Sequence, residues 1–186
     1  MGSMTNAKRI VRNEDEGEIA DAPRAPAFDH ERLKGTNINP KTFLASDFLN
    51  HFNGVEMVIE MLPQMPEYFE ELLAWKPRSY REHFAQSSLR DANLALEAYD
   101  HAPAELREMF EHTVHRLNET AERAIHSAGI ALTTEDPDII AFSCAGAAGE
   151  LRALIGEAGG LINGTAMRDS RPNRASQDAV DAFFDN

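Results

Sequence analysis

The sequence is poor in cysteine and in long apolar runs, and each shortage excludes a class of protein. Its only cysteine, Cys144, cannot form an internal disulfide and has no companion at metal-ligand spacing, so neither an oxidising compartment nor a zinc site is indicated. No run reaches the roughly 18 to 20 uninterrupted apolar residues of a membrane span. We therefore expect a cytoplasmic protein without membrane insertion, and we read residues 1–3 as a remnant of cloning.

Positive charge is also scarce. The chain has 18 Lys and Arg against 31 Asp and Glu, which gives a formal net charge of −13 at pH 7. Proteins that bind nucleic acid need clustered positive charge to displace the counterions of the phosphate backbone. The sequence therefore argues against a nucleic-acid partner and leaves room for a basic protein face.

The length and hydrophobic content of the chain are sufficient for one folded domain with tails. The chain has 186 residues, of which 42% are hydrophobic, and this suits a single core. Residues 1–35 mix charge runs with Pro23 and Pro26 and have few large apolar side chains, so we expect a disordered N-terminal tail there. We expect a helical bundle domain over 36–164, followed over 165–186 by a flexible linker and an amphipathic peptide.

The fold class expected for the body is all-α, with an antiparallel bundle ending in a long helical hairpin. Asn39-Pro40 and Asp136-Pro137 each combine a capping side chain with a proline at the first helical position, and so predict helix starts. Helical spacing of apolar residues predicts helices over 40–62, 66–75, 78–85, 89–99, 103–128 and 137–163. The last is rich in small residues over 145–149, which indicates close approach to another helix.

The C-terminal peptide has a small apolar face of its own. Val180, Phe183 and Phe184 stand at positions i, i+3 and i+4 behind a polar linker. A helix of about ten residues is not stable alone in water, so these side chains need a groove to bind. The spacing leaves open whether that groove belongs to a partner or to the chain's own bundle.

The residues of the peptide carry a resemblance that favours a partner. Residues 176–184 read Ser-Gln-Asp-x-Val-Asp-x-Phe-Phe. This pattern closely resembles the C-terminal peptide of the CheZ family of chemotaxis phosphatases and, more loosely, the N-terminal peptide of the FliM family of flagellar switch proteins. Both peptides bind the CheY receiver as a short amphipathic helix. The resemblance covers about ten of 186 residues. It implies a CheY-like response-regulator receiver as partner, contacted by Ser176, Gln177, Asp178, Val180, Asp181, Phe183 and Phe184.

Dephosphorylation of a receiver aspartate needs a side-chain amide that orients a water molecule and an acidic group beside it. On the helix expected over 40–62, Asp47 and Asn50 share a face, with Asn53 as an alternative amide. We take Asp47 and Asn50 as candidate catalytic residues. Their stripe is formed by Phe43, Asp47, Asn50, Gly54, Met57 and Met61. The same spacing also fits a second buried seam with one hydrogen-bonded polar pair.

The body does not repeat the active helix of the CheZ family. That helix resembles Asp-Phe-Gln-Asp-Leu-Thr-Gly-Gln, and the nearest stretch here is Asp47-Phe48-Leu49-Asn50-His51-Phe52-Asn53-Gly54. In this register Asn50 stands at the catalytic acid and Gly54 at the catalytic glutamine. An aspartyl-phosphate phosphatase here would therefore use a different layout. We expect no cofactor in the protein itself, since the Mg²⁺ would belong to the receiver.

Histidines suggest two rival functions. A stripe on the helix over 103–128 would suit a carboxylate-histidine metal site, but it lies opposite the apolar face of that helix, so we expect no metal. The stripe is formed by His112, His115, Glu119, Glu122 and His126. His126-Ser127-Ala128-Gly129 loosely resembles the site of a histidine phosphotransfer domain but lacks the lysine-glycine that should follow. His51, beside Asp47, is more typical of a structural histidine.

The sequence thus predicts a receiver-binding protein of a chemotaxis or two-component pathway that promotes receiver dephosphorylation. The alternatives are a non-catalytic adaptor that sequesters the receiver and a histidine-phosphotransfer-like bundle. Whether the bundle forms a homodimer stays open at this point.

Overall fold

The computed structural model describes residues 28–165, and this part of the chain is helical without any strand. The all-α prediction is confirmed. The α-helices are α1 (Asn50–Met61), α2 (Phe69–Leu73), α3 (Tyr80–Ala85), α4 (Ala92–Asp100), α5 (Ala104–Leu132) and α6 (Pro137–Asn163). Short 3-10 helices span His30–Leu33, Ser46–Leu49 and Pro66–Tyr68.

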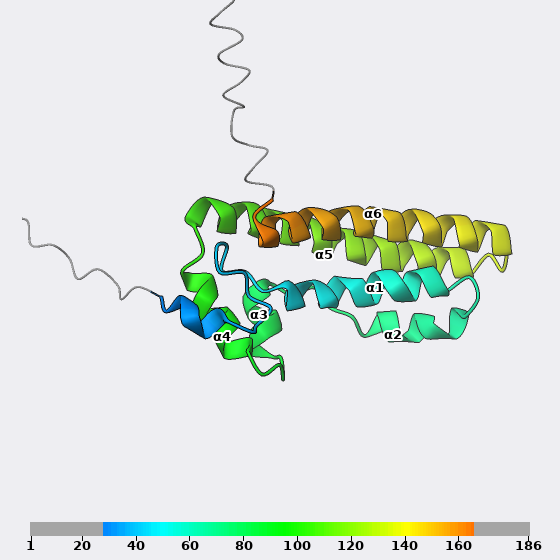
Figure 1. Cartoon of the computed structure of the whole chain (residues 1–186). Helices are drawn as coiled ribbons and strands as arrows, with labels where there is room; N and C mark the ends of the chain where they lie inside the picture. The colour runs from blue at the N-terminus through cyan, green and yellow to red at the C-terminus, as the bar shows by residue number, and fades with distance from the viewer. Residues whose placement is uncertain (1–27, 166–186) are drawn as a thin grey trace, which may run out of the picture.

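The two longest helices, α5 and α6, form the predicted antiparallel hairpin (Figure 1). Helix α1 lies along this hairpin and packs on both of its helices. Helix α2 covers one end of α1, while α3 and α4 pack together at the other end of the molecule. The result is an elongated three-helix body with a smaller cap of short helices at each end.

The core follows the predicted apolar faces. On α5 the stripe of Leu106, Phe110, Val114, Leu117 and Ala121 is buried against α1 and α6. Burying a side chain of this size stabilises the fold by about 1.5–3 kcal/mol. One continuous cluster joins these residues to Phe48 and Phe52 of the first helical segment and to Leu151 of α6.

Both ends of α6 agree with the sequence prediction. The Asp136 carboxylate accepts hydrogen bonds from the backbone N–H groups of Asp138 and Ile139, and Pro137 occupies the first turn. Gly164 ends the helix at φ +70°, a left-handed conformation that glycine adopts without strain. Local sequence signals were sufficient to predict both ends of α6, because the Asp136 cap, Pro137 and Gly164 all act on the same helix.

The first long helix begins later than predicted. Asn39 caps only a turn, by accepting from the N–H groups of Lys41 and Thr42, and Phe43 has φ +60°. A β-bridge between Ile38 and Ala45 closes this loop. The 3-10 turn starts at Ser46 and α1 at Asn50, so Phe43 does not belong to the helical face assigned to it.

The folded body also begins earlier than the boundary predicted after residue 35. Leu33 is buried, and the Phe28 ring lies 5.4 Å from the Phe43 ring. The Arg32 guanidinium donates to the Glu97 carboxylate at 2.6 Å. Residues 28–35 are therefore part of the body. The rest of the predicted N-terminal tail lies outside the described residues.

Gly146, Gly149 and Gly156 of α6 face away from the bundle, so these glycines do not mark the close approach between helices that the small residues over 145–149 had predicted. A Cβ added at Gly146, Gly149 or Gly156 would meet nothing within 4 Å. Each such glycine costs roughly 1 kcal/mol of helix stability relative to alanine. Of the helices in residues 28–165, α6 alone is long and apolar enough to cross a membrane, and only 17% of its apolar window is buried.

Candidate functional site

The candidate catalytic residues gather at the start of α1. Asp47 lies in the 3-10 turn before the helix, Asn50 is the first residue of α1, and Asn53 follows one turn later. Asp47 is half-buried, whereas both asparagines are exposed. The Asn37 side-chain amide donates to Asp47 Oδ1 at 2.9 Å and holds the carboxylate in place. An acid and two amides thus share one accessible end of the helix.

The face that continues from these residues is open to solvent. A Cβ added at Gly54 would meet nothing within 4 Å, and Met57, one turn further on, is 55% exposed. Asn50 is exposed as well. The interpretation of this stripe as a second buried seam is therefore wrong for Asn50 and Met57, while Gly54 and Met61 are half-buried. A flat surface of another protein has room to approach here.

The end of α6 lies beside this face. The Thr42 hydroxyl donates to the Ile162 carbonyl at 2.6 Å. A Cβ added at Gly159 would lie 3.7 Å from Leu49 Cδ1, next to Asn50. The chain therefore leaves the described body, at Thr165, at the same end of the molecule as the candidate residues (Figure 1).

His51 fixes the loop that follows α2. Its Nε2 lies 3.0 Å from the Lys76 carbonyl oxygen, its ring stacks on Trp75 at 4.9 Å, and the Trp75 indole N–H donates to the His51 carbonyl. Burial, with smaller contributions from the charges of His83 and Arg78, lowers the pKa of His51 to about 4. The ring is neutral at pH 7 and serves as a structural anchor.

This lowered pKa predicts a loss of stability in acid. Between pH 6.5 and about 4 the unfolded chain takes up a proton at this position and the folded chain does not, so stability falls as the pH falls through this window. Because the ring is only half-buried, solvent screening reduces the effect to about 1–2 kcal/mol.

Urea unfolding of wild type and His51→Gln at several pH values measures this effect. The variant is expected to lose less stability than wild type between pH 6.5 and 4. His126→Gln, at an exposed position, is the matched control and should follow wild type. Parallel curves for wild type and His51→Gln would show that His51 is not the titrating group.

The histidine stripe of α5 lies on the surface. His112, His115 and His126 are exposed, and the contact within the stripe joins His115 Nε2 to a Glu119 carboxylate oxygen at 3.4 Å. Among residues 28–165 no group of three or more His, Cys, Asp or Glu side chains is arranged to hold a metal ion. The geometry offers no support for a site built on this stripe.

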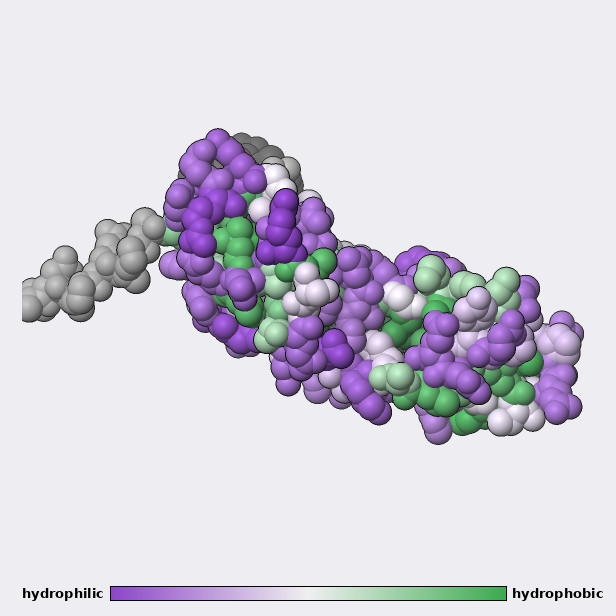
Figure 2. Space-filling view, turned by 90° about the horizontal axis from the view of Figure 1, so that it is seen from below, coloured by the Kyte–Doolittle hydropathy of each residue, from purple (hydrophilic) through white to green (hydrophobic). Residues whose placement is uncertain are grey.

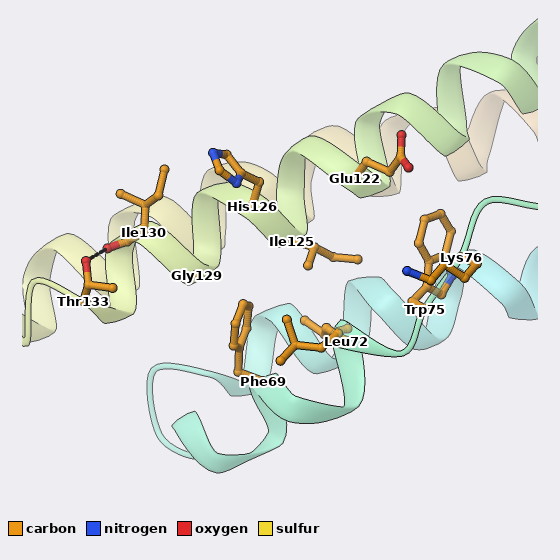
Figure 3. A pocket seen from close by; sticks show the side chains of 11 residues that line it. Phe69, Leu72, Trp75, Lys76, Glu122, Ile125, His126, Gly129, Ile130 and Thr133 are labelled. Atoms are coloured by element: carbon orange, nitrogen blue, oxygen red, sulfur yellow. Dashed lines mark hydrogen bonds between the residues drawn. The ribbon is translucent and has the colours of Figure 1, made fainter.

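A groove between α2 and α5 was not anticipated from the sequence. It has a volume of about 490 Å³ and an apolar floor that includes Phe69, Leu72 and Ile125 (Figure 3). Leu73 and Ile130 at its edges are 61% and 56% exposed. Seen from below, apolar residues interrupt the polar surface at the end of the molecule where α2 lies (Figure 2).

One signal in the sequence could have indicated this groove. Gly129 interrupts the good helix formers of α5, and a Cβ added there would lie 2.7 Å from Phe69 Cζ. The glycine therefore admits the phenylalanine ring of α2 against the α5 backbone. No helical period connects these two positions, so their contact could not be derived from spacing.

The residues assigned to partner binding, from Ser176 to Phe184, lie outside the described residues. Searches with protein-family models, among curated proteins and among solved structures find no match to this chain. The function of the protein is therefore inferred from the peptide sequence over 176–184 and from the face at the start of α1 that carries Asp47, Asn50 and Asn53.

Proposed function

We propose that this protein is a cytoplasmic docking protein for a CheY-like receiver and promotes the dephosphorylation of that receiver. The peptide containing Val180, Phe183 and Phe184 captures the receiver, and the face at the start of α1 meets its phosphorylated site. The observation that carries the proposal is the peptide sequence from Ser176 to Phe184. Its resemblance to two receiver-binding peptides, each from a different protein family, supports a receiver as the ligand.

The position of the tether supports the second half of the proposal. Ten residues separate Thr165 from Ser176, and a linker of that length spans roughly 16–19 Å. A receiver held by the peptide is thus kept near the end of the molecule where α6 ends and α1 begins. Tethering of this kind gives an effective concentration on the order of millimolar, which compensates for a weak second contact.

The α1 face supplies groups suited to the reaction. An exposed amide of Asn50 or Asn53 orients a water molecule for in-line attack on the phosphorus, and Asp47 engages the conserved basic side chain of a receiver site. The open space at Gly54 leaves room for the receiver surface. The Mg²⁺ that neutralises the phosphoryl oxygens is held by the receiver. The net charge of −13 favours approach to a basic protein face.

A non-catalytic adaptor is the second candidate function. It is favoured by the hydrogen bond from Asn37, which already occupies one oxygen of the Asp47 carboxylate. In that case the peptide alone accounts for receiver binding, and the α1 face has no chemical role.

Receiver binding is tested by titrating the full chain against CheY-like receivers from the same cell, with and without a phosphoryl mimic. The double variant Phe183→Ala/Phe184→Ala is expected to bind at least about a hundredfold more weakly, since buried aromatic side chains dominate the energy of such contacts. Asp185→Ala, outside the apolar set, is the control and should bind as wild type does. Equal binding by wild type and the double variant would refute the role of the peptide.

A further inference from the structure

A second groove lies between the first turns of α5 and the last turns of α6, at the end of the molecule where α5 begins and α6 ends (Figure 1). It has a volume of about 600 Å³. Met109, which is 47% exposed, and the buried Leu161 form its apolar part. Three exposed glutamates also line it, at positions 105, 108 and 157. The groove is therefore an apolar channel between acidic side chains.

The described chain neutralises only one of these three carboxylates. Glu157 accepts hydrogen bonds from the Arg116 guanidinium and the Thr113 hydroxyl. No ion pair within residues 28–165 involves Glu105 or Glu108. The groove therefore suits an occupant that combines positive charge with an apolar side chain.

The chain leaves α6 on the same side as this groove. The Thr165 N–H donates to the Gly160 carbonyl at 2.9 Å, and the Thr165 hydroxyl oxygen lies 3.3 Å from the place of a Cβ added at Gly160. Thr165 thus folds back over the last turn of the helix. Gly160 follows Glu157 by three residues, so the two share a helical face, and Glu157 lines the groove. The segment after Thr165 therefore starts beside the groove.

This segment has the chemistry that the groove requires. Residues 166–174 read Ala-Met-Arg-Asp-Ser-Arg-Pro-Asn-Arg, with three arginines against one acidic residue in a chain of net charge −13. An extended chain advances about 3.3 Å per residue, so Arg168 reaches about 10 Å beyond Thr165. The groove follows α5 from Glu105 to Thr113, a length of about 12 Å. The first arginines after the helix therefore come within reach of the glutamates.

We propose that residues 166–171 dock in this groove as a strap that connects α6 to the docking peptide. Met167 packs on Met109, and Arg168 and Arg171 pair with the two remaining glutamates of α5. Exposed ion pairs are individually weak. The strap is joined directly to the end of α6, however, so almost no loop has to be closed and its effective concentration at the groove is high. The inference concerns the bundle and its own chain, and it does not depend on a receiver.

The short connection favours this segment over the other basic stretch of the chain. Residues 8–12 also combine basic and apolar side chains. They precede Phe28, the first described residue, by at least 16 positions, and the acidic run 14–18 lies between. A longer loop costs more entropy to close, and the intervening acidic residues are repelled by the glutamates of the groove.

Disulfide trapping in the full chain tests which surface the segment meets. In a Cys144→Ala background, Met109→Cys/Met167→Cys is expected to form an intramolecular disulfide at least about tenfold faster than Lys41→Cys/Met167→Cys, because docking raises the local concentration of one thiol at the other. Lys41 is the matched control, since it is exposed in the loop that packs on the end of α6 but lies outside the groove. Equal rates would overturn the proposal.

Charge reversal tests the pairing. In the Met109→Cys/Met167→Cys chain, Glu105→Arg/Glu108→Arg is expected to slow the disulfide about tenfold, and adding Arg168→Glu/Arg171→Glu is expected to restore the rate. Helical circular dichroism shows that each variant is folded. Salt at about 1 M, where the Debye length is about 3 Å, should also slow the reaction. A rate that is indifferent to the charge reversal would refute the ion pairs.

Two further outcomes would assign the groove to another occupant. A disulfide-linked dimer in place of the intramolecular bond would mean that a second copy of the chain supplies the segment. Faster trapping of Met109→Cys by Ile10→Cys than by Met167→Cys would mean that the N-terminal basic stretch fills the groove. Either result would contradict the strap.

Discussion

Replacing both exposed amides, as Asn50→Ala/Asn53→Ala, is expected to slow receiver dephosphorylation by about a hundredfold while leaving receiver affinity unchanged. The loss is of the size measured when one preorganised hydrogen-bond donor is removed from an active site. Affinity should survive because the proposed capture site is the peptide around Phe183 and not the α1 face. Decay of the phosphorylated receiver, followed with saturating protein, measures the rate separately from binding.

Asn93→Ala is the matched control for this experiment. Asn93 is also an exposed helical amide, but it lies on α4, so its removal should leave the rate unchanged. An unchanged rate in the Asn50→Ala/Asn53→Ala variant would remove the α1 face from the mechanism. Receiver binding by the peptide would be unaffected, and the adaptor function would then be the better account.

The second large effect concerns stability. Phe110→Ala is expected to destabilise the fold by about 3–5 kcal/mol, because the lost burial is followed by a cavity that the neighbours cannot fill. Phe110 is fully buried, and its ring centroid lies 5.7 Å from those of both Phe48 and Tyr80. It thus joins α5 to the turn before α1 and to α3. Chemical denaturation at pH 7 measures the change.

Leu73→Ala provides the comparison for the core variant. Leu73 is a large apolar residue but is 61% exposed, so its truncation should change the free energy of unfolding by about 0.5 kcal/mol or less. Equal losses in Phe110→Ala and Leu73→Ala would mean that α5 is not packed on α1 and α3 as described.

Sequence patterns predicted the long helices well because their signals are local and agree with one another. In α6, the Asp136 cap, Pro137 and Gly164 define the same 27-residue helix that the structure contains. The same kind of signal at Asn39-Pro40 gave a wrong helix start. There, Ala45 N–H donates to the Tyr80 hydroxyl, 35 residues away, and this contact holds the preceding loop in a non-helical form.

The sequence predicted which residues form the candidate site but not whether their side chains are exposed to solvent. Helical spacing placed Asp47 near Asn50, yet it could not decide between a buried seam and an open face. That decision depends on where α2 and α6 pack on α1, which is set by contacts distant in sequence. Gly146 and Gly149 of α6 illustrate the same limit, since the composition of residues 145–149 revealed a run of small side chains but not the direction in which these glycines face.

Hydrogen exchange of the full chain with and without a phosphorylated CheY-like receiver tests the central claim most directly, because it reports both proposed surfaces at once. The account predicts added protection in the peptide from Ser176 to Phe184 and in the turn and helix from Asp47 to Met57, with no change in the groove at Phe69 and Gly129. Protection confined to that groove, or absent from the peptide, would contradict it.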